Sequence, residues 1–218
     1  MTDQSINALI GEYVAGTLAM PAKTLVDAHL EIVPESREWA QNLEAVAGHS
    51  LESGPEEPIS GRDAMIAAIL DVEPDQSSMD QGGVVAENLE ADDWMPHSLR
   101  SLVGCPANEI PWRMKIPGVY AHELDEVDGC EVMLLRIKPN AAIPTHTHEG
   151  RELALVLKGC FEDGTGHYQR GDVSIADGTV GHKPVAGSDE ECICFLVNDA
   201  PVRFTGPVAR IISSILPH

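Results

Sequence analysis

The chain has 218 residues, of which 43% are apolar, so it is long enough for one large or two modest globular domains with buried cores. Its 35 acidic residues against 14 Lys and Arg give a formal net charge of −21, which disfavours direct nucleic-acid binding because phosphates would be repelled. The sequence has no apolar run of the roughly 18 residues that a membrane span needs and no signal-peptide pattern at its start. We therefore expect a cytoplasmic protein with no membrane segment.

The first part of the chain has the apolar periodicity of helices. The stretches "SINALIGEYVAGTLA", "PAKTLVDAHLEIV", "PESREWAQNLEAVAGHSL" and "SGRDAMIAAILDV" each place apolar residues three and four positions apart. Pro21 stands where proline is favoured, at the start of a helix. The pattern predicts a small helical domain over residues 1–72.

A polar segment separates this part from a second one of different texture. The stretch "EPDQSSMDQGG" has few apolar residues and ends in glycines, which predicts a linker over residues 73–92. Residues 93–218 contain short runs rich in β-formers, such as "CEVMLLRIKP" and "ECICFLVND", separated by Pro-Gly and Asp-Gly turns. Many short strands without intervening helices predict a β-sandwich or small barrel. The fold class is therefore α+β, with two domains.

The cysteines give little sign of a disulfide framework. Their number is odd and they all lie in the second half of the chain: Cys105, Cys130, Cys160, Cys192 and Cys194. Without an export signal we expect reduced thiols. In a strand, Cys192 and Cys194 would face the same side and belong to the core.

One stretch, "IPTHTHEGRELALVLKGCF", carries a candidate metal site. In a strand, His146 and His148 point to the same face, and Glu152 follows a turn that leads into the next strand. His182 occupies a similar strand-end position further on. Three imidazoles and one carboxylate are suitable ligands for a divalent first-row metal.

The spacing of these residues resembles the two-part signature of the cupin superfamily. It is H-x-H-x3-E-x6-G in the first part, and G-x5-D-G-x3-H from Gly171 to His182 in the second. The resemblance implies a cupin β-barrel, that is, a double-stranded β-helix or jelly roll, over residues 93–218. It also implies one metal held by His146, His148, Glu152 and His182. Zinc is favoured, with iron, manganese and nickel as alternatives.

The whole chain resembles the ChrR-type anti-sigma factors, in which a helical zinc-binding domain precedes a cupin. The stretches that carry the resemblance are "YVAGTL", "TLVDAHL", "ESREW", "HTHEGRELALVLKGCFED" and "CICFLVNDAPVRF". The resemblance implies an extracytoplasmic-function sigma factor as partner. It further implies that the helices inhibit this factor and that the cupin releases it on a stress signal.

The helical half departs from this family at its metal site. The family pattern is H-x3-C-x2-C with an earlier histidine, whereas here His29 is followed by Val33 and Ser36 in the two cysteine positions, and the earlier histidine falls near Gln4. These residues cannot form a thiolate-rich zinc site. We expect His29 to lie on the helix surface or at a helix junction, and Val33 to pack where the metal held the helices together.

Two other functions remain open. The protein could be a cupin metalloenzyme, for example a dioxygenase, with the helices as an interaction appendage. It could also be a metal-binding regulator without a sigma partner. The sequence has no obvious acid-base residue beside the ligands, which favours sensing over catalysis, so no catalytic residue is assigned. The metal, the signal, the particular sigma factor and homodimer formation are left undetermined.

Overall fold

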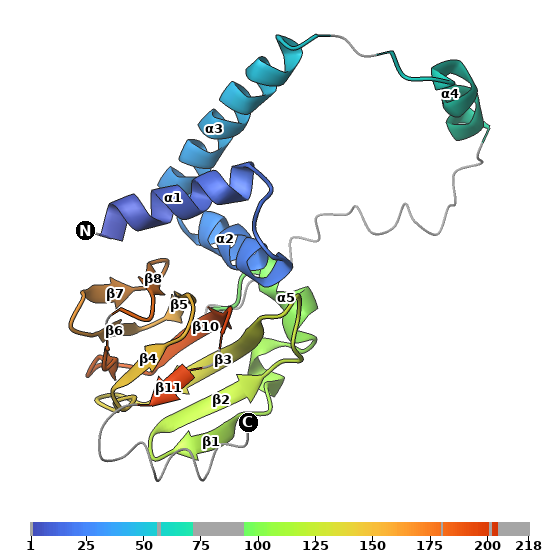
Figure 1. Ribbon diagram of the computed structural model, residues 1–218. Coiled ribbons are helices and arrows are strands. Elements are labelled where there is room, and N and C mark those ends of the chain that lie inside the picture. Colours follow the sequence, from blue (N-terminus) through green and yellow to red (C-terminus); the bar gives the residue numbers. More distant parts are fainter. Residues whose placement is uncertain (1, 56–57, 72–93, 180, 201, 205–218) are drawn as a thin grey trace. The chain divides into compact units, whose positions relative to one another are not determined.

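The chain begins with helices, as the apolar periodicity predicts (Figure 1). The computed structural model describes residues 2–55, 58–71, 94–179, 181–200 and 202–204. Its helices are α1 (Thr2–Val14), α2 (Met20–Ile32), α3 (Pro34–Glu52), α4 (Arg62–Leu70), α5 (His97–Val103) and the short 3-10 helix η2 (Ala107–Glu109). Among the described helices, none has both the length and the hydropathy needed to span a bilayer. The predicted linker over residues 73–92 lies outside the described residues.

The rest of the described chain is made of short antiparallel strands. They are β1 (Arg113–Ile116), β2 (Val119–Glu123), β3 (Glu131–Ile137), β4 (His146–His148), β5 (Glu152–Lys158), β6 (Cys160–Glu162), β7 (His167–Gln169), β8 (Val173–Ala176), β9 (Val185–Ala186), β10 (Cys192–Asn198) and β11 (Val202–Phe204). Turns with positive φ separate several of them, including Asn140 (φ 61°), because asparagine tolerates this conformation better than most residues.

The strands form two layers, which confirms the predicted cupin-like sandwich. One layer is a six-stranded sheet with the order β1-β2-β3-β10-β5-β8. The other contains the three-stranded sheet β7-β6-β9 and the pair β11-β4. Isolated bridges join Ala142 to Val185 and His146 to His182, which connects β4 and the segment before it to the β9 region.

The space between the layers is filled by alternate residues of the strands. This inner core contains Val119, Ala121, Leu135, Ile137, Ala154, Val156, Phe161, Tyr168, Ala186, Cys192, Cys194 and Leu196. Because successive side chains of a strand point to opposite faces, the residues between these ones face outward. On β10, for example, Ile193, Phe195 and Val197 belong to a different core.

That second core joins the helices to the outer face of the six-stranded sheet. Buried residues of α1 and α2, such as Leu9, Leu25 and Val26, share it with Leu155 and Phe195 of the sheet. The sequence predicts one helical domain over residues 1–72, whereas the compact units divide the chain differently. Residues 1–44 and 94–218 form one unit, and residues 45–93 form another. The physical reason is that the apolar faces of α1 and α2 pack on the sheet.

The unit of residues 45–93 contains α4, whose packing is unlike that of α1 and α2. Its sequence RDAMIAAIL is mostly apolar, yet none of its residues is buried. Ile69 and Leu70 expose 70% and 79% of their surface.

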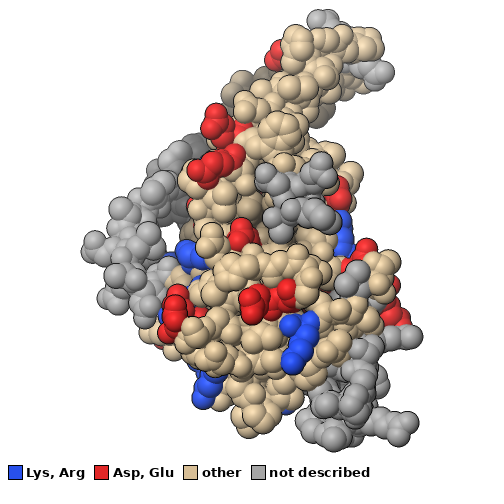
Figure 2. Space-filling model, turned by 90° about the vertical axis from the view of Figure 1, so that its left-hand side faces the viewer, with Lys and Arg blue, Asp and Glu red and all other residues tan. Residues whose placement is uncertain are grey.

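The excess of acidic residues is visible on the surface. On the face drawn in Figure 2, Asp and Glu side chains occur at several places over the molecule. Among the described residues of this face, Lys and Arg lie singly or in small groups and do not form one large basic patch.

Candidate metal centre

Two histidines that are far apart in the sequence are joined by their backbones. His146 begins β4, and its amide and carbonyl exchange hydrogen bonds with those of His182, at 3.2 Å from His146 N to His182 O and 3.1 Å in the other direction. Both residues are buried. Their ring centroids lie 4.3 Å apart with a 55° angle between the planes. The bridge therefore places the two imidazoles side by side.

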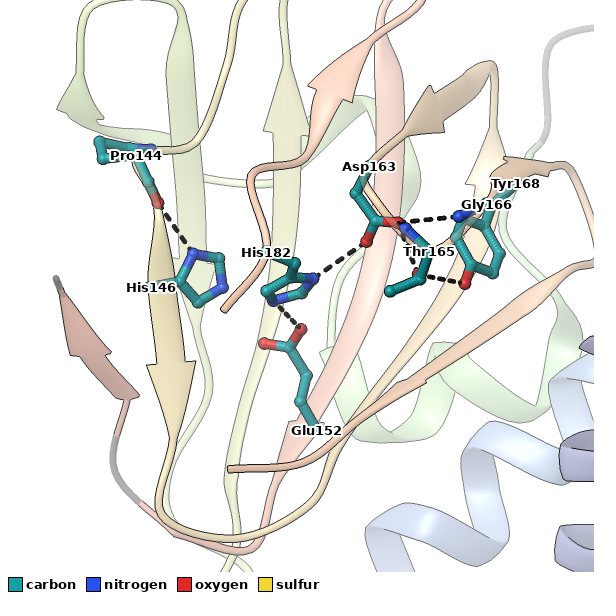
Figure 3. Close-up of polar contacts among 8 residues, drawn as sticks. All are labelled: Pro144, His146, Glu152, Asp163, Thr165, Gly166, Tyr168 and His182. Carbon is teal, nitrogen blue, oxygen red and sulfur yellow. Dashed lines mark hydrogen bonds and ion pairs between the residues drawn. The ribbon is translucent and has the colours of Figure 1, made fainter. Parts of the chain in front are cut away.

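Glu152 completes this cluster from the opposite layer. It is the first residue of β5, and it is buried between the two sheets. Its Oε1 atom lies 3.7 Å from Nε2 of His182 (Figure 3). One potential ligand atom from each of His146, Glu152 and His182 lies within 4.8 Å of the other two. The structure thus brings together three of the four residues that the sequence predicts as ligands.

The fourth predicted ligand is His148. Its backbone lies at the end of β4, paired with Val202 of β11. Its side chain lies outside the described residues, so its role stays a prediction.

Hydrogen bonds define the tautomers of His146 and His182, the two histidines of the cluster. Nδ1 of His146 lies 2.9 Å from the carbonyl oxygen of Pro144, and Nδ1 of His182 lies 3.0 Å from Oδ2 of Asp163. Both partners are acceptors, so each Nδ1 carries the proton and donates it. Nε2 of each ring is then the nitrogen with a lone pair, as in histidines that bind a metal. The donor set therefore fits a metal ion.

Asp163, in the Asp-Gly pair that follows β6, is a site residue for which the motif spacing gives no signal. The turn is present, because Oδ1 of Asp163 accepts hydrogen bonds from the amides of Thr165 and Gly166 and from the Thr165 hydroxyl. Its other oxygen, Oδ2, accepts the bond from His182 (Figure 3). Burial acts to raise the pKa of Asp163, but these hydrogen bonds outweigh it and lower the pKa to about 2. Asp163 is therefore ionised and orients the His182 ring.

The surroundings of Glu152 raise the pKa of its carboxyl group, in contrast to Asp163. Burial raises its pKa to about 7, the nearby His182 acts to lower it, and the negative charge of Asp163 raises it further. A carboxylate in this environment gains stability from a cation beside it. A bound metal ion would supply that positive charge.

His29, the one histidine that remains of the family's helical metal-site pattern, is part of a hydrogen-bonded junction. His29 is buried in α2, with Nδ1 2.7 Å from the carbonyl oxygen of Gly171 and Nε2 2.8 Å from Oγ of Ser36. Nδ1 donates to the carbonyl, and Nε2 accepts the Ser36 hydroxyl proton. Val33 packs over Gly171, since a Cβ atom there would lie 2.8 Å from Cγ2 of Val33. This confirms the expectation of packing at a junction.

The five cysteines are all free thiols. Sγ of Cys192 lies 3.6 Å from Sγ of Cys194, which confirms that both face the same side of the strand, inside the inner core. The hydrogen bond that the Cys194 thiol donates to Cys192, followed by burial, raises the pKa of Cys194 well above 9.0. The negative charge of Glu152 contributes in the same direction.

The two strand layers and the buried imidazole–carboxylate cluster define a cupin domain with a candidate metal centre, preceded by helices. Residues 101–202 match the family model described as the ChrR cupin-like domain. The chain is 34% identical over 207 residues to the anti-sigma-E factor ChrR of Cereibacter sphaeroides, which covers 94% of this chain and 93% of that protein. The chain therefore belongs to the ChrR family of anti-sigma factors.

A solved structure agrees with this assignment over both parts of the chain. It is the crystal structure of Rhodobacter sphaeroides SigE in complex with the anti-sigma ChrR. The similarity has a TM-score of 0.72 and 32% sequence identity, and it covers 88% of this chain and 96% of the matched one.

Proposed function

We propose that this protein is an anti-sigma factor that binds and inhibits an extracytoplasmic-function sigma factor in the cytoplasm. The observation that carries the proposal is the similarity to ChrR, at 34% identity over 94% of the chain. The relative was crystallised with SigE, and the matched chain is covered almost completely. The similarity thus includes the helices as well as the cupin.

The unburied apolar residues of α3 and α4 are the surface that we assign to the sigma factor. They all lie in the unit of residues 45–93: Val46 and Leu51 of α3, and Met65, Ile66, Ile69 and Leu70 of α4. A nine-residue helix such as α4 is too short to be stable in water by itself. Exposed apolar side chains in such number are typical of a surface that a partner covers. In this proposal α4 gains its stability from the sigma factor.

The cupin would hold one divalent metal, with zinc as the first choice. His146, Glu152 and His182 are brought together for this role, and His148 is proposed as the fourth ligand. Zinc accepts imidazole and carboxylate ligands. Its positive charge would stabilise the buried carboxylate of the cluster. Asp163 holds the His182 ring in place.

A short route connects this centre to the helices. Gly171, whose carbonyl accepts the bond from His29, lies two residues before the start of β8. β8 pairs with β5, where Ala176 lies opposite Glu152, and the chain then continues to His182. A change at the cluster therefore has a path of a few residues to the contact with α2. This supports release of the sigma factor through loosening of α2 under a stress signal such as an oxidant.

The binding surface can be tested with the full chain. Ile69→Asp combined with Leu70→Asp should abolish co-purification with the sigma factor encoded nearest to this gene and relieve repression of its promoter. Met114→Asp is the matched control, because Met114 is also apolar and 64% exposed but lies on β1 of the barrel. Repression unaffected by the α4 double variant would exclude this surface.

The sensing role needs a separate measurement. His182→Ala should preserve repression but reduce its release under oxidative stress, because His182 belongs to the cluster and not to the α4 surface. If the full chain binds no sigma factor and instead consumes oxygen with a small substrate, the protein is a cupin metalloenzyme.

A further inference from the structure

Asn198 is a buried amide with no polar partner. It is the last residue of β10 and only 1% of its surface is exposed. Neither Nδ2 nor Oδ1 has a hydrogen-bond partner among the described residues. Buried amide groups in proteins almost always have one, so an exception requires an explanation.

The side chain of Asn198 shares the interior of the barrel with the candidate metal centre. Cys192, Cys194 and Leu196 belong to the inner core, and the alternation along β10 places Asn198 on the same face. Asn198 lies directly opposite Glu152 in the register of β10 and β5. Side chains in such a cross-strand pair point to the same face, with Cβ atoms about 5 Å apart. The amide is therefore next to the carboxylate of the cluster.

We infer that Asn198 binds a small oxygen ligand, either water or a carboxylate anion, that lies beside Glu152 and also coordinates the metal. An amide offers two N–H donors and one carbonyl acceptor. Such a group can donate to an anionic oxygen and can accept from a water molecule. His146, Glu152 and His182 can each coordinate the metal through one ligand atom. Asn198 would not bind the metal, and its N–H groups can instead donate hydrogen bonds to a small ligand of the metal.

This inference deepens the proposed function and rests on its metal site. It gives the sensor a place where a small molecule can meet the metal inside the protein. It also assigns a role to the one interior residue of β10 whose side chain is an amide, in a strand whose interior positions are otherwise apolar or cysteine.

The test compares Asn198→Leu with the wild-type protein, both loaded with Co²⁺ as a spectroscopic substitute for zinc. The visible spectrum is titrated with acetate, and a pH titration without acetate follows the bound water. We expect Asn198→Leu to weaken acetate binding about tenfold, the loss of one hydrogen bond to a charged group. A shift confined to the pH titration would identify water as the ligand. Both titrations unchanged would overturn the inference.

Two further readouts separate this inference from its alternatives. Cobalt stoichiometry should be equal in both proteins, because Asn198 is not itself a metal ligand; a loss of metal in Asn198→Leu would overturn the inference in favour of a role in holding Glu152. In chelator, Asn198→Leu should be at least as stable as the wild type, because no partner loses a hydrogen bond. A marked loss of stability would mean a structural role and would also overturn it.

Ser174→Ala is the matched control. Ser174 is buried on the same face of the sheet, but it lies opposite Ala154 and not opposite Glu152. It should leave both titrations unchanged. If the wild-type protein takes up no cobalt, the proposed metal site itself is refuted. If both proteins take up cobalt equally but bind ligands alike, only the inference about Asn198 is refuted.

Discussion

The Nδ1 atom of His29 donates a hydrogen bond of 2.7 Å to the carbonyl oxygen of Gly171, a residue 142 positions further along the chain. The bond joins α2 to the turn before β8. The same ring accepts a hydrogen bond from Ser36 at the start of α3. One buried imidazole therefore connects two helices and the barrel. In this chain a histidine, a serine and Val33 occupy positions that the family pattern assigns to metal ligands.

This junction should make stability depend on pH. Burial lowers the pKa of His29 below 6.5, although the bond to Gly171 and the charge of Asp172 act to raise it. The folded state thus favours the neutral ring, whereas the unfolded chain takes up a proton near pH 6.5. The contribution of His29 to stability is complete above that pH. It falls below it by at most about 1.4 kcal/mol per pH unit, until the folded-state pKa is reached.

Urea denaturation between pH 5 and 8 measures this effect. The wild-type protein should lose more stability on acidification than His29→Gln, which has no titratable ring. His49→Gln is the matched control, because it removes an imidazole from an exposed position of α3. Identical pH profiles for His29→Gln and the wild type would contradict the prediction.

The helices should remain folded when metal is removed. The junction of His29, Ser36 and Val33 needs no ion, because both ring nitrogens of His29 have protein partners. Circular dichroism of the full chain in strong chelator should retain its helical signal. A loss of that signal would reveal a metal in the helical part.

Metal analysis of the purified protein should give about one equivalent per chain, since the described residues offer one cluster of suitable ligands. His146→Ala combined with His148→Ala should abolish it, because imidazoles provide most of the affinity of such a site. A stoichiometry near two would mean that a second site exists.

Asp163→Asn should weaken metal binding about 10- to 100-fold, the usual effect of removing a carboxylate that orients a histidine ligand. Competition with a chromophoric chelator measures the affinity. Asp177→Asn is a close control. Asp177 is exposed and accepts the same pair of bonds, from the amide and the hydroxyl of Thr179, but among the described residues it has no hydrogen bond to a histidine. Equal affinities in the two variants would contradict the role of Asp163.

Gly171→Ala should destabilise the protein by about 1–3 kcal/mol, through backbone strain and overpacking together. Gly171 has a φ of 94°, and a Cβ atom there would lie 2.8 Å from Val33 and 3.1 Å from Ile32. Gly129→Ala separates the two causes. Gly129 also has a positive φ, of 75°, but nothing lies within 4 Å of its Cβ position. Thermal unfolding should show the larger loss for Gly171→Ala.

The sequence by itself determined the class of fold and most of the candidate site. Apolar periodicity predicts the helices, and short β-rich runs between turns predict the strands, because both signals are local. The spacing of His146, His148, Glu152 and His182 predicts which side chains share a face, since alternation along a strand has a period of two. The resemblance to ChrR-type proteins, which the comparisons confirm, also rests on these local stretches.

Only the tertiary structure decided what these residues meet. Asp163 is a turn residue by its sequence, and its contact with His182 arises because the two layers close around the cluster. The sequence around His29 does not predict its hydrogen bond to Gly171, and the sequence around Asn198 does not predict that it pairs with Glu152. Local sequence likewise does not predict that α1 and α2 pack on the sheet. Such contacts join residues far apart in the chain, and they depend on strand order and register, which local patterns do not encode.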